Sequence, residues 1–274
     1  MNKFHLFKSF FLAAFILTTL AACEPGPSTK IFNEAELHLS RGEYLEAIKK
    51  HTELINRYPA SPLAPESLFK KGHIYYRYLS EIEMAVKTYN ELAYLYPESP
   101  KLANAAIDKG EIYSALGEHW KAVKEYEWLL KNAGSGEGEA YRYLIAMEYF
   151  KMNDFRQARI EFAEIVQKSG ASELLPEIHF RVATSYYLEG KLPESLTAYK
   201  LVIKLFPDHP LAHESKVNIS QVHADAGRLN EALVELKKLK RDGGHPDPEL
   251  IDMRIKLLEE RIKRPGQKKK RKKR

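Results

Sequence analysis

The sequence lacks the features that usually reveal an enzyme or a disulfide-bonded domain. Its 274 residues include one cysteine, Cys23, so no disulfide can form within the chain. The glycine-rich stretch at residues 134–138 lacks the Gly-Lys-Ser/Thr sequence of a phosphate-binding loop. Neither the Gly-x-Ser-x-Gly motif of a nucleophilic serine nor the His-Glu-x-x-His motif of a zinc protease occurs. We therefore expect no enzymatic activity, no cofactor and no catalytic residue.

A metal site is not indicated either. Ten histidines are present, but only His209 and His213 are four residues apart. Pro210 lies between them, and no third ligand stands at helical spacing. We therefore predict surface or packing roles for these two histidines.

The body of the chain lacks an excess of positive charge, although the whole sequence has a formal net charge of +6. Eight Lys and Arg residues lie in residues 264–274, and Lys3 and Lys8 lie near the start. Because these ten charges exceed the net charge by four, residues 24–263 carry −4. No basic surface for nucleic acid is implied. We interpret residues 264–274 as a polybasic tail, either solvated and disordered or in contact with anionic lipid.

The sequence also lacks a hydrophobic run long enough to span a membrane. The longest run, residues 10–17, follows two lysines and has the length of a secretory signal. It is followed by Leu-Ala-Ala-Cys at residues 20–23, which resembles the lipobox of bacterial lipoproteins. That resemblance implies a signal peptide over residues 1–22, lipid on the Cys23 thiol and a tether over residues 23–27.

The residue after Cys23 bears on the destination of the anchor. Glu24 stands where an Asp would imply retention in the inner membrane. We therefore expect a lipid anchor in the outer membrane, with the body of the chain at its periplasmic face. The alternative is an ordinary cleaved signal that happens to contain a cysteine.

What the sequence does contain is a repeat with a period of 36–38 residues. Each of six copies has a small residue in a first predicted helix and another in a second, followed four residues later by a larger side chain. The small residues of the first helices are Ala35, Gly72, Gly110, Ala146, Ala183 and Ser220. Those of the second helices are Ala47, Ala85, Ala122, Ala158, Ser195 and Ala232, and the larger residues are Tyr89, Tyr126, Phe162, Tyr199 and Leu236, with His51 as the exception.

This pattern predicts six helical hairpins. Small residues allow two helix backbones to cross closely, and a large residue one turn away fills the space beside the crossing. Because each hairpin leaves an apolar face uncovered, only a stack of hairpins buries a continuous core. A residue that tolerates a left-handed conformation follows the first helix in five copies: Gly42, Gly117, Asn153, Gly190 and Gly227.

The order of small residue, aromatic residue, glycine, alanine, aromatic residue and proline resembles the tetratricopeptide repeat. The resemblance implies an all-α fold, a right-handed superhelical solenoid of about six hairpins, and a role in binding proteins. We place copies one to three in residues 28–132 and copies four to six in residues 140–242. Residues 133–139 between them are interpreted as a Gly-rich hinge.

After the last copy, residues 249–263 predict a capping helix over the end of the stack. The apolar face of this helix is expected to contain Leu250, Met253, Leu257 and Leu258.

The family resemblance also implies a peptide-binding groove on the inner side of the solenoid. In the family, residues at fixed positions around the small residue of the first helix line this groove. Aromatic rings flanked by Arg and Lys suit an extended or helical peptide. The alternative for Phe69, Tyr143 and Phe180 is packing between repeats, and the same alternative applies to Tyr76, Phe150 and Tyr187. The groove candidates are Phe69, His73, Tyr76, Arg77, Tyr143, Met147, Phe150, Lys151, Phe180, Thr184 and Tyr187.

The lipobox-like motif, the short tether and the Tyr-Pro-x-Ser-Pro linker at residues 96–100 together resemble the assembly lipoproteins of the outer-membrane BAM complex (BamD/YfiO-like). This resemblance implies a membrane-anchored adaptor in outer-membrane protein assembly, with envelope proteins or client peptides as partners. The alternative is a coordinator of peptidoglycan, secretion or pilus machinery built on the same scaffold.

Overall fold

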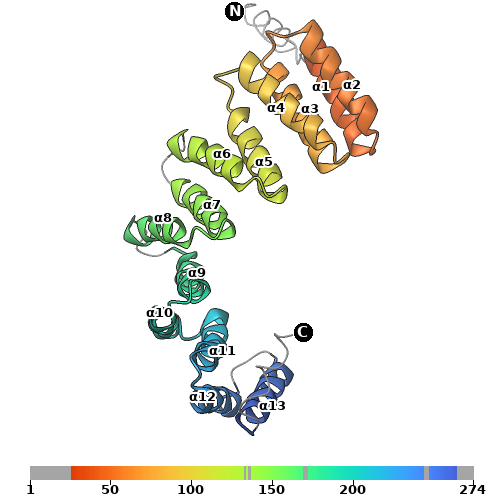
Figure 1. Cartoon of the computed structure of the whole chain (residues 1–274). Helices are drawn as coiled ribbons and strands as arrows, with labels where there is room; N and C mark the ends of the chain where they lie inside the picture. The colour runs from red at the N-terminus through yellow and green to blue at the C-terminus, as the bar shows by residue number, and fades with distance from the viewer. Residues whose placement is uncertain (1–25, 133, 135–136, 169–171, 244–246, 264–274) are drawn as a thin grey trace, which may run out of the picture. The chain divides into compact units, whose positions relative to one another are not determined.

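Helices account for all the regular structure in the described part of the chain (Figure 1). The computed structural model describes residues 26–132, 134, 137–168, 172–243 and 247–263. Over these residues, thirteen helices form consecutive antiparallel hairpins and one final helix. The predicted all-α class and the hairpin solenoid are therefore confirmed.

The chain divides into two compact units, residues up to Asp108 and residues from Lys109 on, each described by itself. The first unit holds α1 (Pro27–Ser40), α2 (Tyr44–Arg57), α3 (Leu63–Arg77), α4 (Ile82–Leu95) and the first half of α5 (Lys101–Ala115). The second unit holds the rest of α5, α6 (His119–Asn132), α7 (Gly138–Lys151), α8 (Phe155–Lys168), α9 (Leu175–Leu188), α10 (Leu192–Leu205), α11 (Pro210–Asp225), α12 (Leu229–Arg241) and α13 (Pro248–Lys263).

Some predicted segments lie wholly or partly outside the described residues. These are the signal peptide, Cys23 and most of its tether, three residues of the proposed hinge, and the polybasic tail. The division between the compact units falls inside α5, whereas the proposed hinge lies between α6 and α7. The hinge therefore stays a prediction. Among the described helices, none combines the length and the apolar character needed to cross a membrane.

The small residues predicted for the helix crossings are buried in every hairpin. Ala47, Ala85, Ala122, Ala158 and Ala232 have no exposed surface, and the same is true of Ala35, Ala146 and Ala183 in the first helices. The larger residue after each second-helix site is also buried, at most 2% exposed from Tyr89 to Leu236. The crossing pattern inferred from the sequence is therefore confirmed by the packing.

Turns inside the hairpins adopt the left-handed conformation at the predicted residues. Gly42, Gly117, Gly190 and Gly227 have φ between 74° and 80°, and Asn153 has φ of 60°. The copy without such a residue uses Ser80, with φ of 56°. In that copy the two small residues, Gly72 and Ala85, are thirteen residues apart instead of twelve, so its turn has an extra residue.

The last helix packs against α12 with a face that overlaps the predicted one only in part, since of the predicted residues Leu258 is buried there. In α13, Ile251 and Leu258 are buried against α12, and Ile255 packs beside them. Met253 and Leu257 are 54% and 52% exposed, so assigning them to the buried face was wrong. The apolar residues of α13 form two overlapping stripes along the helix. Only the contact with α12 determines which of these stripes is buried.

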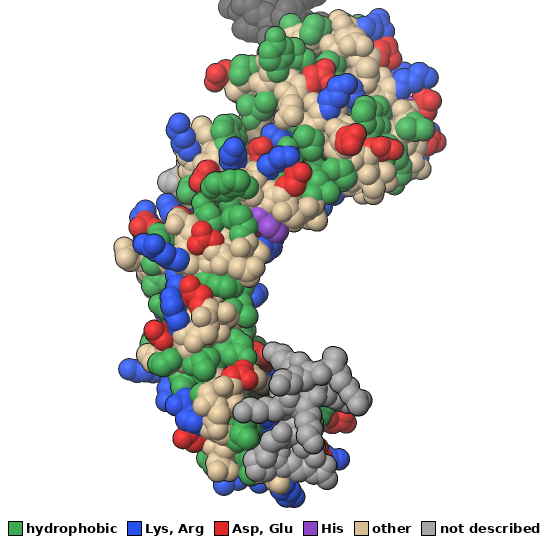
Figure 2. All heavy atoms as spheres, viewed as in Figure 1, with side chains coloured by type: hydrophobic (Ala, Val, Ile, Leu, Met, Phe, Trp, Pro, Cys, Tyr) green, Lys and Arg blue, Asp and Glu red, His purple; other side chains and the backbone are tan. Residues whose placement is uncertain are grey.

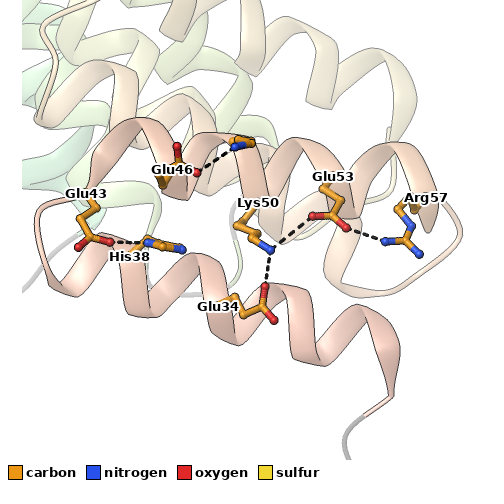
Figure 3. Close-up of polar contacts among 8 residues, drawn as sticks. Glu34, His38, Glu43, Glu46, Lys50, Glu53 and Arg57 are labelled. Carbon is orange, nitrogen blue, oxygen red and sulfur yellow. Dashed lines mark hydrogen bonds and ion pairs between the residues drawn. The ribbon is translucent and has the colours of Figure 1, made fainter.

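The first hairpin carries ion pairs along its surface (Figure 3). Lys50 Nζ of α2 lies 2.5 Å from Glu34 Oε2 of α1 and 3.6 Å from Glu53 Oε2. Near the turn, His38 Nδ1 lies 2.5 Å from Glu43 Oε2. Exposed pairs of this kind contribute little stability, about 0–1 kcal/mol each. Their effect is to give the terminal repeat a polar outer surface, which an end repeat needs.

Arg159 makes several contacts across the joint between α8 and α9. Arg159 of α8 donates to Ser185 Oγ at 2.9 Å and lies 2.7 Å from Glu189 Oε2. Its guanidinium carbon also lies 4.3 Å from the centre of the Tyr186 ring. The helix contact here is less extensive than that of α6 with α7 or of α10 with α11.

His51 occupies the site where other copies place a larger aromatic or aliphatic residue. It is fully buried, and its ring meets Phe32 of α1 edge-on at 5.6 Å. Neither ring nitrogen has a hydrogen-bond partner, and the nearest acid oxygen, Glu36 Oε1, lies 3.6 Å from Nε2. Burial, and secondarily the charge of Lys70, lowers the pKa of His51 to about 4. The imidazole is therefore neutral in the folded hairpin at neutral pH.

Replacement of Gly72 tests how closely the helices cross. A Cβ at this position would lie 2.6 Å from Cε1 of Tyr89, whose ring is 1% exposed and donates a hydrogen bond to Asp108. We expect Gly72→Ala to lower the free energy of unfolding by about 1–3 kcal/mol, despite the higher helix propensity of alanine. Urea denaturation measures the change.

Gly138→Ala is the matched control, because the nearest atom to a Cβ there is Leu130 Cδ1 at 3.4 Å. A double variant, Gly72→Ala/Tyr89→Leu, gives copy two the aliphatic residue of copy six and should recover part of the loss. If Gly72→Ala were as stable as the original chain, α3 and α4 would not cross as closely as the structure indicates.

Acid should weaken the first hairpin through His51. The unfolded chain binds a proton as the pH falls through 6.5, whereas the folded hairpin does so only near pH 4. The neutral imidazole of His51 therefore makes its full contribution to the free energy of unfolding above pH 6.5. This contribution, about 3 kcal/mol, is lost as the pH falls from 6.5 to 4. Chemical denaturation should show a smaller loss from pH 7 to pH 4.5 in His51→Phe. An identical pH dependence of variant and original chain would contradict this origin.

Candidate functional site

Three groove candidates pack inside their own hairpins. Phe69, Tyr143 and Phe180 of the first helices face the large buried ring of the following second helix. Their ring centres lie 6.0 Å from Tyr89, 6.0 Å from Phe162 and 5.7 Å from Tyr199, respectively. Phe32 makes the same contact with His51 in the first hairpin. These rings therefore contribute to packing within their hairpins. Tyr143 and Phe180 also pack against clusters that include Ile178 and Ile219 of the following copies, in line with the alternative of packing between repeats.

In the first unit, the groove candidates of α3 surround a buried carboxylate. His73 Nδ1 donates to Asp108 Oδ2 at 2.8 Å, and Arg77 Nη2 lies 3.5 Å from Asp108 Oδ1. The Tyr89 hydroxyl donates to the same Oδ2 at 2.5 Å. The Arg77 guanidinium also stacks on Tyr76, 4.4 Å from the ring centre. Residues from α3 and α4 thus meet at one acid on α5.

Burial of Asp108 would by itself raise its pKa. The hydrogen bonds from His73 and Tyr89, together with the charges of His73 and Arg77, outweigh burial and lower the pKa of Asp108. The carboxylate therefore stays ionised and fixes the surrounding donors. The His73 ring is held by its hydrogen bond to Asp108, whereas the Arg77 side chain is 43% exposed and accessible to a partner.

In the second unit, the candidates of α7 and α9 contact residues of neighbouring helices. Phe150 meets Phe155 of α8 edge-on at 5.1 Å, and the Arg181 guanidinium of α9 lies 5.8 Å from the Phe150 ring centre. Lys151 Nζ lies 2.7 Å from Glu148 Oε1 and 2.6 Å from Ser114 Oγ, with its side chain 42% exposed. Met147 packs in the cluster around the buried Phe162.

The remaining candidates, on α9, form hydrogen bonds to other helices. The Tyr187 hydroxyl donates to Asp225 Oδ2 of α11 at 2.6 Å. Burial, then the hydrogen bond to Asp225, raises the pKa of Tyr187 to about 12, so the phenol stays protonated and remains a donor. Thr184 Oγ1 donates to the Phe180 carbonyl and lies 3.0 Å from the Tyr199 hydroxyl.

The sequence analysis did not identify the polar side chains that contact these candidates from neighbouring helices. Asp108 and Asn218 occupy the same repeat position, two residues before the small residue of a first helix, and each hydrogen-bonds the tyrosine of the preceding copy. Arg181 occupies this position in copy five. The available signal was a polar residue at this position in five of the six copies, with Leu144 of copy four as the exception.

The site offers exposed cations beside aromatic rings, with acids already paired beneath them. Such a surface suits binding to a peptide. On the face shown in Figure 2, basic and acidic side chains lie interspersed within each unit. In the described ranges, no three His, Cys, Asp or Glu residues are arranged to hold a metal ion.

Comparison with known families supports the repeat assignment. Models described as tetratricopeptide repeat match residues 66–99 and residues 143–210. No curated protein matches the chain in sequence.

Solved structures resemble the chain in fold. A tetratricopeptide repeat protein from Parabacteroides merdae has a TM-score of 0.54 at 16% identity, over 84% of this chain and 98% of that one. The C-terminal part of a repeat protein from Cytophaga hutchinsonii has a TM-score of 0.57 at 15% identity, over 77% and 78%. YrrB, described as a TPR protein with an unusual peptide-binding site, has a TM-score of 0.50 at 19% identity, over 75% and 97%.

At these identities the likeness concerns the fold alone. Together with the two matched segments, it shows that the chain contains tetratricopeptide repeats and has the helical-hairpin fold of proteins built from them.

Proposed function

We propose that the chain is a membrane-anchored scaffold that binds protein partners through first-helix side chains of its repeats. The observation that carries this proposal is an exposed cation that directly follows a half-buried ring in the sequence, at the same two repeat positions in copies two and four. Arg77 stacks on Tyr76 in copy two, and Lys151 follows Phe150 in copy four. Each cation is held by a buried acid, Asp108 or Glu148, so its position is fixed before a partner arrives.

The proposed ligand is an extended or helical peptide segment. Half-buried rings supply contact area at little entropic cost, and the fixed cations can pair with carboxylates or carbonyls of the peptide. The peptide-binding site named for YrrB supports binding of this class on a similar fold.

The N-terminal sequence supports a location for this scaffold. The Leu-Ala-Ala-Cys motif and the short tether favour anchoring of the chain by lipid in the outer membrane, facing the periplasm. With the Tyr-Pro-x-Ser-Pro linkers, they favour an adaptor in outer-membrane protein assembly. A coordinator of peptidoglycan, secretion or pilus machinery uses the same surface and is the second candidate.

Removal of the two exposed cations tests the binding surface. The variant Arg77→Gln/Lys151→Gln keeps a hydrogen-bond donor near each acid and removes both charges. We expect at least about tenfold weaker recovery of envelope proteins in pull-downs from solubilised membranes. The melting temperature should change little, because both side chains are more than 40% exposed.

The matched control is Lys49→Gln/Arg57→Gln on the first hairpin, where both cations are exposed and paired with acids of their own helix. This control should retain its partners. Full recovery with Arg77→Gln/Lys151→Gln would place the binding surface elsewhere on the repeats.

Lipid anchoring is tested separately. Metabolic labelling with an alkyne fatty acid should mark the original chain and leave Cys23→Ala unlabelled, because Cys23 is the only thiol. The original chain should fractionate with the outer membrane. Equal labelling of both proteins would contradict the anchor but would leave the protein-binding surface untouched.

A further inference from the structure

A second candidate site lies at the turn side of two neighbouring hairpins in the second unit. It is an open pocket of about 610 Å³ between the turn that joins α5 to α6 and the turn that joins α7 to α8. None of the groove candidates lines it. The lining residues are Gly117, Glu118, His119, Trp120, Lys121, Tyr149, Met152 and Asp154.

Two aromatic rings form the walls of this pocket. Trp120, near the start of α6, is 61% exposed, an unusual state for the largest apolar side chain. Its ring centre lies 6.4 Å from that of Tyr149, with the planes inclined at 61°. The rings meet edge to face, so a group that enters the pocket can lie over the exposed Trp120 ring beside Tyr149.

The pocket floor is held in place by a buried acid. His119 Nδ1 lies 2.7 Å from Glu148 Oε2, and the Glu148 side chain is 2% exposed. Glu148 also accepts from Ser114 and Lys151. The imidazole is thus oriented before any ligand enters the pocket.

The charges around the pocket favour a cation. Glu118 and Asp154 contribute two carboxylates against one ammonium, that of Lys121. This ammonium is already engaged, 2.7 Å from Glu118 Oε2 and 5.2 Å from the centre of the Tyr113 ring. Burial, then the charges of Glu127, Glu161 and Asp154, raises the pKa of the Tyr149 hydroxyl, as expected in a field of negative sign.

We propose that this pocket binds a lysine or arginine side chain of a partner protein, with the cation over the exposed Trp120 ring and the carboxylate of Asp154 in the same lining. Ring faces attract cations within about 6 Å, most strongly for tryptophan, and a carboxylate at the rim adds a charge pair. A purely apolar side chain gains nothing from the acids. The site goes beyond the proposed groove, since none of its lining residues is a groove candidate.

Trp120 can report on binding directly. The chain has two tryptophans, so Trp128→Phe leaves Trp120 as the only one. In the full chain, purified in a non-ionic detergent, its fluorescence is titrated at low salt with an acetylated Gly-Arg-Gly-Arg-Gly amide. The second probe is the same peptide with citrulline for arginine, which keeps the shape and removes the charge.

We expect a saturable change in emission with the arginine peptide and binding at least about fivefold weaker with the citrulline peptide. In the same background, Asp154→Asn should weaken the arginine peptide about threefold or more. Asparagine can still accept from Gln157 N at the start of α8, as Asp154 does at 3.1 Å, so the helix keeps its cap. Glu164→Gln, an exposed acid on the same helix, is the control and should have no effect.

Equal affinity for both peptides, or no saturable change, would overturn the proposal. Deletion of residues 264–274 is the final arm. If that deletion shifted the Trp120 emission and tightened binding of the arginine peptide, the chain's own tail would occupy the pocket, and the assignment to a partner protein would be wrong. Since none of the substituted residues is a groove candidate, failure here leaves the pull-down experiment unaffected.

Discussion

The structure depends on the close crossing of two helices within each hairpin. A small residue on each helix brings the backbones together, and the buried ring or aliphatic side chain four residues further fills the space beside them. At Gly72 and Gly110 the ring approaches so closely that a Cβ would collide with it. Because this geometry recurs in each copy, the first-helix side chains return at matching positions, and both candidate binding surfaces follow from it.

The sequence was enough to predict the hairpins, since their determinants are local. A small residue, a ring one turn later and a left-handed turn residue all lie within one copy, and five of the six turns were identified from residue type alone. Ser80 escaped notice because its copy has a longer turn, and serine has no special preference for positive φ. The face of α13 was misassigned because two apolar stripes overlap, and only contact with Leu236 and Leu239 of α12 distinguishes them.

The site was less predictable because its residues are defined by neighbours in other copies. Phe69, Tyr143 and Phe180 carry the residue types of a binding surface, but each faces a buried ring of its own hairpin. Asp108 carries no motif, and its role follows from the tyrosine and histidine that reach it from α4 and α3. Trp120 and Tyr149 are 29 residues apart in the sequence, and only the stacking of α6 on α7 brings them together.

The contacts of Arg159 across the α8 and α9 joint have a consequence for how the second unit comes apart. In a stack where each hairpin touches only its neighbours, cooperative unfolding divides at the weakest interface. Helices α8 and α9 lie close together over a shorter stretch than the helices at the other joints of this unit, and the guanidinium links to Ser185, Glu189 and Tyr186 are partly ionic. Ionic strength therefore acts on this joint more than on the crossings inside the hairpins. Amide exchange in rising salt would resolve α9 to α13 as one block that opens separately from the helices before it.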